Sequence, residues 1–253
     1  YVLEEFAPSE MHVLRRDGGK LSAMLATYPP AVKPKAYKAE FRARFCEALL
    51  ARYVLVVEGR TEFDAIPAAA RRLNDLNPTE YKTLEALGVA VIDAQTDAQV
   101  APLGKFFRDL GKTVFAVFDK QEPAASAAIK AAVHHSFESA EKGFENVVLH
   151  HTAEAALRRY ALSLVAENAW PNHLIAKTPN AAQTVEQIRD ALRQFFGWAK
   201  GSGDAGDLLG CCTEAEMPQY VRDTLRVIHI TVEPPPLPPV PSAAAAPFDD
   251  EEL

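Results

Sequence analysis

The sequence lacks the features that mark several large classes of protein. Its 253 residues include only three cysteines, Cys46, Cys211 and Cys212, which favour a reducing, cytoplasmic location over a disulfide framework. The adjacent pair does not have the spacing of zinc ligands. No apolar run approaches the roughly 20 residues that span a bilayer, and no signal-peptide pattern is present. A membrane role is therefore not expected.

Positive charge is also scarce overall, since the net charge is −7. Proteins that bind nucleic acid by electrostatics alone are usually basic, so such binding would need metal ions or a local basic face. The first fifth of the chain is locally basic, and this run is either a solvated helix face or a set of phosphate contacts. Its members are Arg15, Arg16, Lys20, Lys33, Lys35, Lys38, Arg42, Arg44 and Arg52.

Apolar runs alternate with helical patterns from Tyr53 onward, which predicts an α/β fold with a parallel sheet. The expected strands lie at 53–57, 88–92, 113–118 and 146–149. The expected helices between them lie at about 62–76, 97–110 and 123–133. Residues 1–36 are expected to be irregular because prolines interrupt them, and residues 36–51 show helical periodicity.

The second half of the chain has a different character. Long helical patterns at 152–169 and 180–200 predict a helical insertion, and shorter helices are expected at about 204–212 and 218–227. The end is rich in proline and acids and is expected to be disordered. The predicted divisions are a joining segment and helix (1–50), an α/β core (51–151), the insertion (152–199), a return to the core (200–232) and a tail (233–253).

Acidic residues follow the predicted strands at the edge where α/β sheets place their sites. Glu58 ends the first strand, Gly59 suits the tight turn, and Glu62 falls in the first turn of the next helix. Asp119 ends the third strand. Like charges gathered this way do not stabilise a fold, so we expect a divalent cation with oxygen ligands, such as Mg²⁺. Asp93 ends the second strand and is either a further ligand or a helix cap.

Lys200 ends a long helical pattern and opens the sequence Lys-Gly-Ser-Gly. This flexible turn would allow an ammonium group to reach the acidic edge. The alternative is a lysine that interacts only with the carboxyl end of its helix, beside a glycine cap.

The sequence from Ala51 to Glu62, with Asp119 about sixty residues later, resembles the Toprim domain. The first motif and the Lys200 turn are most similar to the OLD (overcoming lysogenization defect) family, over about residues 40–230. That resemblance implies a Toprim nuclease, which in this family follows an ABC-type ATPase region. No Walker motif is present here, and the chain starts with Tyr. We therefore expect the C-terminal region of a longer, homodimeric protein, with residues 1–36 left from the join.

The chain departs from the Toprim pattern at one position. Toprim domains usually carry Asp-x-Asp where this chain has Asp119-Lys120-Gln121. Gln121 would then supply a neutral oxygen to a metal or to its bound water. The resemblance also implies an acid in a Gly-x-Glu context, which Glu145 matches.

These residues together predict a metal-dependent DNA endonuclease. Glu58 and Asp119 would hold one Mg²⁺ or Mn²⁺ ion, and Glu62 would hold a second with Glu145 or Asp93. Lys200 would stabilise the transition state, and Arg42, Arg44 and Arg60 would contact DNA phosphates. Ca²⁺ would bind without supporting cleavage.

Other functions of similar sheets fit less well. A topoisomerase needs a tyrosine-bearing domain and a primase needs a zinc module, and neither is evident. The non-enzymatic alternative is a phosphoacceptor or regulatory interaction module, which also gathers acids at strand ends. It would require two adjacent acids after its first strand, and covalent labelling by an acyl phosphate would distinguish it.

Overall fold

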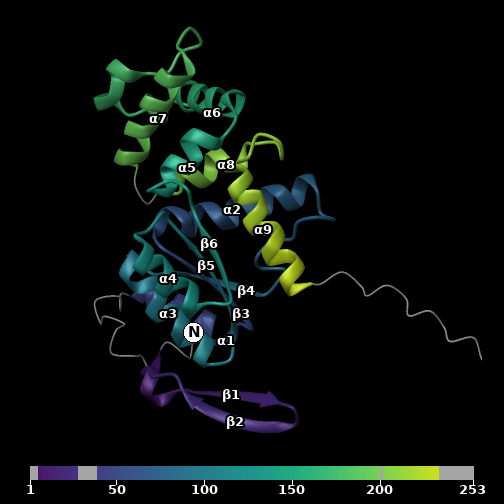
Figure 1. Ribbon diagram of the computed structural model, residues 1–253. Helices are drawn as coiled ribbons and strands as arrows, with labels where there is room; N and C mark the ends of the chain where they lie inside the picture. Colours follow the sequence, from purple (N-terminus) through teal and green to yellow (C-terminus); the bar gives the residue numbers. More distant parts are fainter. Residues whose placement is uncertain (1–4, 28–38, 200–201, 234–253) are drawn as a thin grey trace, which may run out of the picture.

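The computed structural model describes residues 5–27, 39–199 and 202–233. At its centre is a four-stranded parallel sheet in the order β4-β3-β5-β6 (Figure 1). Its strands are β3 (Tyr53–Val57), β4 (Val89–Asp93), β5 (Thr113–Phe118) and β6 (His135–Glu138). The chain runs from β3 to β4 and then returns to the other side of β3. The carboxyl ends of β3 and β5 therefore flank the point where the strand order reverses, which is the usual site position in such sheets.

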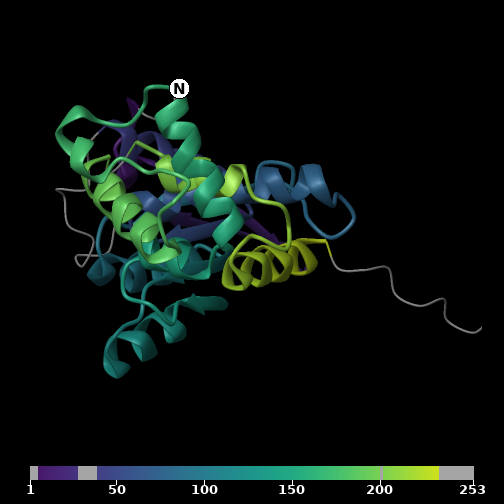
Figure 2. The ribbon, with the colours of Figure 1, turned by 90° about the horizontal axis from the view of Figure 1, so that it is seen from above.

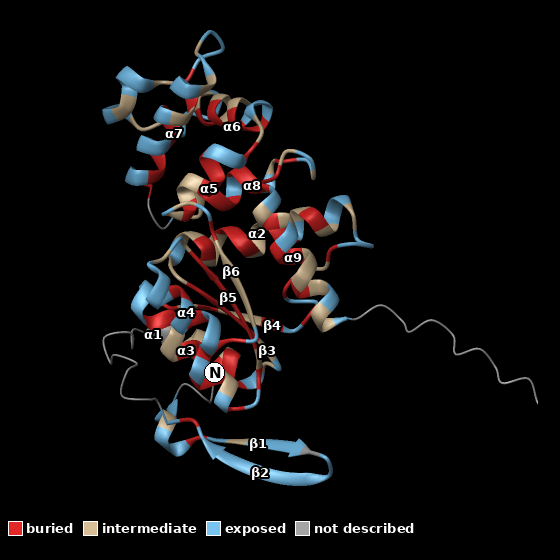
Figure 3. Ribbon diagram, viewed as in Figure 1, coloured by how far each residue is buried: buried red, intermediate tan, exposed pale blue. Residues whose placement is uncertain are grey.

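Helices cover both faces of the sheet because the central strands are apolar on both sides. Leu55, Val57 and Val117 face a core formed with α2, α5, α8 and α9. Val54 and Val56 face a second core formed with α1, α3 and α4. Figure 3 shows the buried residues along the sheet and on the helix faces turned toward it. The helix bounds are α1 (Ala39–Leu50), α2 (Arg60–Leu76), α3 (Asp97–Asp109), α4 (Pro123–Ala132), α5 (Phe144–His151), α8 (Asp204–Gly210) and α9 (Gln219–Val232).

A helical layer lies beyond α5 and α8. It consists of α6 (Glu154–Ala166), the short 3-10 helix η4 (Asn172–Lys177) and α7 (Val185–Trp198). The chain then returns through α8, which packs along α2, and the last described helix, α9, lies beside α2, as the view from above shows (Figure 2). None of the described helices is both long and apolar enough to cross a bilayer.

Two sequence predictions were wrong. Residues 146–149 are not a strand but part of helix α5, and the fourth strand is β6, which lies earlier in the chain. Residues 12–25 are not irregular but form an antiparallel hairpin of β1 (His12–Asp17) and β2 (Lys20–Leu25), after the short 3-10 helix η2 (Pro8–Glu10). The turn of the hairpin uses Gly18 and Gly19 at positive φ, as two-residue hairpin turns require.

Candidate functional site

Glu58 and Asp119 lie side by side at the carboxyl edge of the sheet. The register pairs Val57 of β3 with Val117 of β5, so the residues that follow these strands are neighbours. The Glu58 backbone N–H donates to the Val117 carbonyl at 3.1 Å. The Asp119 backbone N–H in turn donates to the Glu58 carboxylate at 3.0 Å. The predicted convergence of these two strand ends is therefore present.

Glu62 is a buried carboxylate in the first turn of α2, with 4% of its surface exposed. Burial raises its pKa to about 8, and the neighbouring charges of Asp119, Glu145 and Glu58 act in the same direction. Gly59 has an extended backbone (φ −149°), so it does not serve the turn through conformational freedom. A side chain there would instead place its Cβ 3.3 Å from a Glu62 carboxylate oxygen. The glycine therefore leaves room for Glu62.

Asp119 is only partly satisfied by the protein. Its Oδ2 accepts the Gly143 backbone N–H at 2.7 Å, but its buried Oδ1 has no hydrogen-bond partner among the described residues. Burial and the charge of Glu58 raise its pKa to about 6. Burial also raises the pKa of Glu58, although the hydrogen bond from Asp119 opposes this shift. The site therefore carries more negative charge than the described protein groups compensate.

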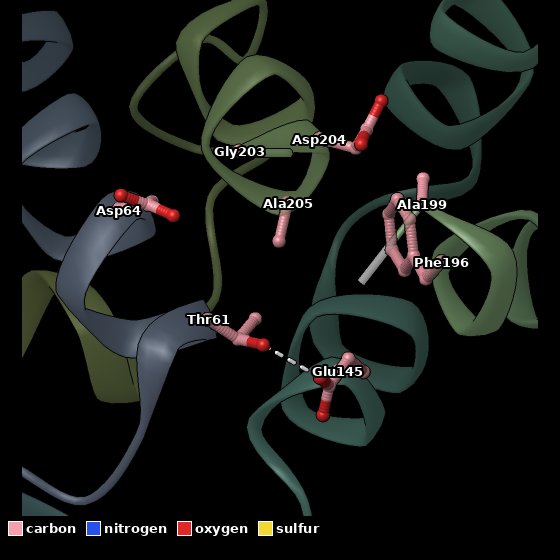
Figure 4. Close-up of a pocket in the computed structure, with 8 residues that line it drawn as sticks. All are labelled: Thr61, Asp64, Glu145, Phe196, Ala199, Gly203, Asp204 and Ala205. Carbon is pink, nitrogen blue, oxygen red and sulfur yellow. Dashed lines mark hydrogen bonds between the residues drawn. The ribbon is translucent and has the colours of Figure 1, made fainter. Parts of the chain in front are cut away.

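Glu145 joins this group from the first turn of α5. Its Oε1 accepts a hydrogen bond of 2.6 Å from the Thr61 hydroxyl, which Figure 4 shows pointing at the carboxylate. Both residues line a small cavity of about 20 Å³, which also contacts Phe196 of α7 and Ala205 of α8. A space of that size holds about one water molecule. Helices from distant parts of the chain thus enclose this end of the site.

The other two predicted ligands have different surroundings. Asp93 ends the outer strand β4, and its Oδ1 accepts the Gln95 backbone N–H at 2.6 Å, which is typical of a turn. Gln121 points its amide nitrogen at Glu58, with 3.0 Å between Nε2 and Oε2. Metal binding by Asp93 and by Gln121 stays a prediction from the sequence.

Sequence reasoning missed several residues that shape the site. The Thr61 hydroxyl donates a hydrogen bond to Glu145. Its position inside the Glu58–Glu62 motif could have indicated a role at the site. Glu138 ends β6 and accepts hydrogen bonds from Lys130, Ser126 and the Gln121 backbone, which lower its pKa to about 2. It was missed because β6 was missed. Lys142 is an exposed lysine whose charge lowers the pKa of Glu58 and Asp119.

Tyr220 was also missed, and it connects α9 to this edge of the sheet. Its hydroxyl donates to the Phe137 carbonyl at 2.7 Å. Burial, followed by the charges of Glu62 and Asp119, raises its pKa, so the phenol stays protonated. Nothing in the position of Tyr220 relative to the sequence motifs indicates that it belongs to the site.

The predicted cations are only partly placed. Lys200 lies outside the described residues. Arg44 and Arg60 both lie over the ring of Phe63, with 5.3 and 5.2 Å to its centroid. Each also forms an ion pair of 2.9 or 2.8 Å, with Glu47 and Asp64 respectively. Arg42 does not take part in these contacts with Phe63, and it donates to the Phe6 carbonyl at 2.9 Å.

A divalent cation fits the donor chemistry of this edge. Glu58, Glu62, Asp119 and Glu145 offer carboxylate oxygens, which hard cations prefer, and the buried Asp119 Oδ1 has no other described partner. Within the described ranges, no three acidic, histidine or cysteine side chains are already arranged as a metal-binding group. Binding would therefore require side-chain adjustment around a preformed backbone.

Comparison with known proteins gives the same fold. Residues 49–120 match the family described as "Overcoming lysogenization defect protein-like, TOPRIM domain". The C-terminal region of the Burkholderia pseudomallei OLD protein is similar over 72% of this chain and 99% of its own, with 18% identity and a TM-score of 0.52. That of the Xanthomonas campestris pv. campestris OLD protein is similar over 74% and 96%, with 17% identity and a TM-score of 0.53.

Comparison with curated protein sequences gives no match. The matched residues 49–120 include Glu58, Glu62 and Asp119, so the family match and the clustered carboxylates concern the same part of the molecule. The resemblance predicted from the sequence is confirmed: residues 49–120 match the OLD-like TOPRIM domain, and the chain has the fold of OLD C-terminal regions.

Proposed function

We propose that this protein is a divalent-metal-dependent DNA endonuclease. The observation that carries the proposal is the group of carboxylates Glu58, Glu62, Asp119 and Glu145 at the carboxyl edge of an OLD-like TOPRIM sheet. The raised pKa values of Glu58, Glu62 and Asp119, and the Asp119 Oδ1 that has no partner among the described residues, indicate a site that needs added positive charge. A nuclease-type role accords with the family match.

These four carboxylates would hold Mg²⁺ or Mn²⁺, with two ions expected. Bound divalent cations would activate a water and neutralise the leaving oxygen of the phosphodiester. The chain itself positions the carboxylates: β3 and β5 place Glu58 and Asp119, while the Thr61 hydroxyl orients Glu145. The Gly143 N–H similarly fixes the Asp119 carboxylate. Ca²⁺ would bind to the same oxygens without supporting cleavage.

Lys200 is proposed to stabilise the charge that develops on the phosphate during cleavage. The residues on either side of it in the chain are near the site, since Ala199 and Gly203 line the cavity beside Glu145. Replacing Lys200 with alanine is expected to slow cleavage strongly while metal binding persists. Lys177→Ala, at an exposed lysine of the short helix η4 in the predicted insertion, is the matched control and should cleave normally.

DNA is the proposed substrate despite the net charge of −7. Bound cations would offset the acidic edge locally. Arg44 and Arg60 share one groove, but each is paired with an acid, so their attraction for phosphate is reduced until those ion pairs open. Their contribution, and that of Arg42, is expected to appear as a salt-dependent loss of DNA affinity on mutation.

The parent protein is proposed to carry an ABC-type ATPase region before this one and to form a homodimer. This proposal rests on the resemblance to OLD proteins, whose C-terminal regions are matched almost completely. Within that arrangement, the ATPase would regulate cleavage by the present region.

The test is incubation of supercoiled plasmid with the protein and Mg²⁺, Mn²⁺, Ca²⁺ or EDTA. Nicking or linearisation is expected with Mg²⁺ or Mn²⁺ only, and Glu58→Ala should abolish it. Glu167→Ala, an exposed acid at the end of α6, is the matched control and should retain activity. Absence of cleavage by the folded wild-type protein with every metal would refute the proposal.

A further inference from the structure

Lys142 lies in the loop between β6 and α5, and the backbone on both sides of it is fixed to the carboxylate edge of the sheet. On one side, the Glu141 carbonyl accepts the Lys120 backbone N–H at 3.0 Å. On the other side, the Gly143 N–H donates to Asp119 Oδ2 at 2.7 Å. These two hydrogen bonds hold the backbone of residue 142 beside the loop that carries Asp119.

The side chain of Lys142, in contrast, is exposed, and its ammonium group forms no ion pair with a described residue. The adjacent acid, Glu141, has other partners, because its Oε1 lies 3.3 Å from both His150 Nδ1 and His151 Nε2. These histidines belong to the last turn of α5. The positive charge of Lys142 is therefore not neutralised by any acid among the described residues.

The charge of Lys142 nevertheless acts on the carboxylates of the site. Burial raises the pKa of both Glu58 and Asp119, and the positive charge of Lys142 opposes this shift at each of them. Lys142 is thus near the acids that follow β3 and β5, while its ammonium group remains open to solvent. A DNA strand that reached these acids would bring its phosphates close to this ammonium group.

Lys120 adds a second exposed cation at the same edge. It follows Asp119 directly and forms no ion pair with a described residue. Its backbone hydrogen bond to Glu141 joins the loop after β5 to the loop that carries Lys142. A lysine ammonium binds phosphate as a point charge on a flexible stem, so both side chains can adjust to a DNA backbone.

The arginines predicted from the sequence have less favourable surroundings. Arg44 and Arg60 share their groove with Arg71, and each of the three forms an ion pair with an acid. The groove contains four acids in all, Glu47, Asp64, Glu85 and Asp207. Acids therefore outnumber arginines in this groove, which disfavours a phosphate there. The two loop lysines are the better phosphate ligands because no described acid neutralises them.

We propose that Lys142 and Lys120 bind DNA phosphates next to the scissile bond and so hold the strand against the carboxylates. This inference deepens the proposed function and rests on it, since DNA is the substrate in both. The role differs from that proposed for Lys200, which acts on the charge that develops during cleavage. Replacing Lys142 should therefore weaken DNA binding more than it slows the chemical step.

The test is the fluorescence anisotropy of a labelled DNA duplex in saturating Ca²⁺, at KCl concentrations between about 50 and 200 mM. Lys142→Gln should weaken binding by about tenfold at the lowest salt and reduce the slope of log Kd against log salt by about one. The double variant with Lys120→Gln should reduce the slope by about two. Wild-type affinity and slope for Lys142→Gln would overturn the inference.

Two further variants serve as controls for this measurement. Lys177→Gln removes another exposed lysine that forms no ion pair with a described residue, and it should bind DNA like wild type. Lys142→Arg keeps the positive charge and should stay within about threefold of the wild-type affinity. A loss in Lys142→Arg as large as that in Lys142→Gln would contradict the proposal. Thermal melts of each variant establish that it is folded.

Titration with Ca²⁺ in the absence of DNA excludes an indirect effect through the metal site. Lys142→Gln should bind Ca²⁺ at least as tightly as wild type, because it removes a positive charge that lies near the carboxylates. Weaker Ca²⁺ binding by this variant would overturn the inference, since the loss of DNA affinity would then follow from a disturbed metal site.

The plasmid assay keeps this inference separate from the proposed function. Cleavage by wild type, together with unchanged DNA affinity and salt slope in Lys142→Gln, would refute the inference alone. Failure of every metal to support cleavage, with the predicted loss of DNA affinity in Lys142→Gln, would refute the nuclease and retain the phosphate contacts. Absence of any DNA binding by the wild-type protein would refute the inference.

Discussion

At the scale of single residues, the buried Glu62 shows how the site conflicts with stability. A carboxylate in this position costs the folded protein energy whenever it is ionised and no cation is present. The site is therefore expected to be tuned for a bound ion at the expense of the metal-free fold. Three neighbouring residues support this arrangement. The Thr61 hydroxyl donates to Glu145, Gly59 leaves room for the Glu62 carboxylate, and the Gly143 backbone N–H donates to Asp119.

Glu62→Gln is expected to change how stability depends on pH. The pKa of Glu62 is raised from its ordinary 4.5 to about 8 in the folded state. Its favourable contribution is therefore fully present below about pH 4.5 and is lost as pH rises through about 8. In EDTA, wild type should lose melting temperature between pH 6 and pH 8.5, and Glu62→Gln should lose less.

The matched control for that experiment is Glu167→Gln, which removes an exposed acid and should melt with the wild-type pH dependence. Asp119, with a pKa of about 6, acts in the same direction as Glu62, so part of the dependence is expected to remain in the variant. Identical pH profiles for wild type and Glu62→Gln would count against the raised pKa.

Thr61→Val is expected to weaken metal binding without unfolding the protein. Valine keeps the shape of the side chain but removes the hydroxyl that donates to Glu145 at 2.6 Å. Loss of a group that orients a metal ligand typically reduces affinity by about 10- to 100-fold. Thr61→Ser, which retains the hydroxyl, should bind Ca²⁺ much more nearly like wild type. If valine and serine gave the same affinity, Thr61 would have no positioning role.

At the scale of secondary structure, α2 and α8 are in close contact. Helix α2 carries Glu62, and α8 belongs to the segment that follows Lys200 in the chain. Gly206 of α8 allows this approach, because a Cβ there would lie 3.2 Å from both the Asp64 carbonyl and the Ala68 Cβ. These neighbours are the backbone and a short side chain of α2, so they have little freedom to move.

Gly206→Ala is therefore expected to destabilise the protein by about 1–3 kcal/mol, the usual cost of overpacking. It should also slow cleavage, since α8 would be displaced from α2. Gly210→Ala, in the same helix, meets no atom within 4 Å and should be neutral or slightly stabilising. Denaturant unfolding of the two variants provides the comparison. Equal unfolding free energies for Gly206→Ala and Gly210→Ala would mean that α8 can move away from α2 without a loss of stability.

The elements also show what can be predicted from sequence. β3 and β5 are continuous apolar runs buried on both faces, so their positions and their acidic ends could be read directly. β6 is a half-buried outer strand with three polar residues in four, and it gives no such signal. Val147–Leu149 is an apolar run too short to separate a strand from a buried helix. The glycine pair of the hairpin was a usable signal.

At the scale of the whole molecule, the site combines segments that are far apart in the chain. Glu58 and Asp119 follow strands β3 and β5, Glu145 lies in the helix after β6, and α7, α8 and α9 enclose them from the other side. The sheet-borne carboxylates could be predicted because parallel strands end at one edge. The contacts of Thr61, Glu138 and Tyr220 could not, because they depend on how helices pack over that edge.

The most direct test of the account is the Mg²⁺-dependent plasmid cleavage rate of Asp119→Asn. Asparagine keeps the shape of the side chain and an oxygen that can accept the Gly143 N–H, but it removes the charge at the centre of the site. We predict a loss of about a hundredfold or more, because a direct ligand should matter at least as much as the residues that orient it. Asp190→Asn, an exposed acid on α7, should cleave like wild type. Unchanged cleavage by folded Asp119→Asn would contradict the assignment of this sheet edge as the catalytic centre.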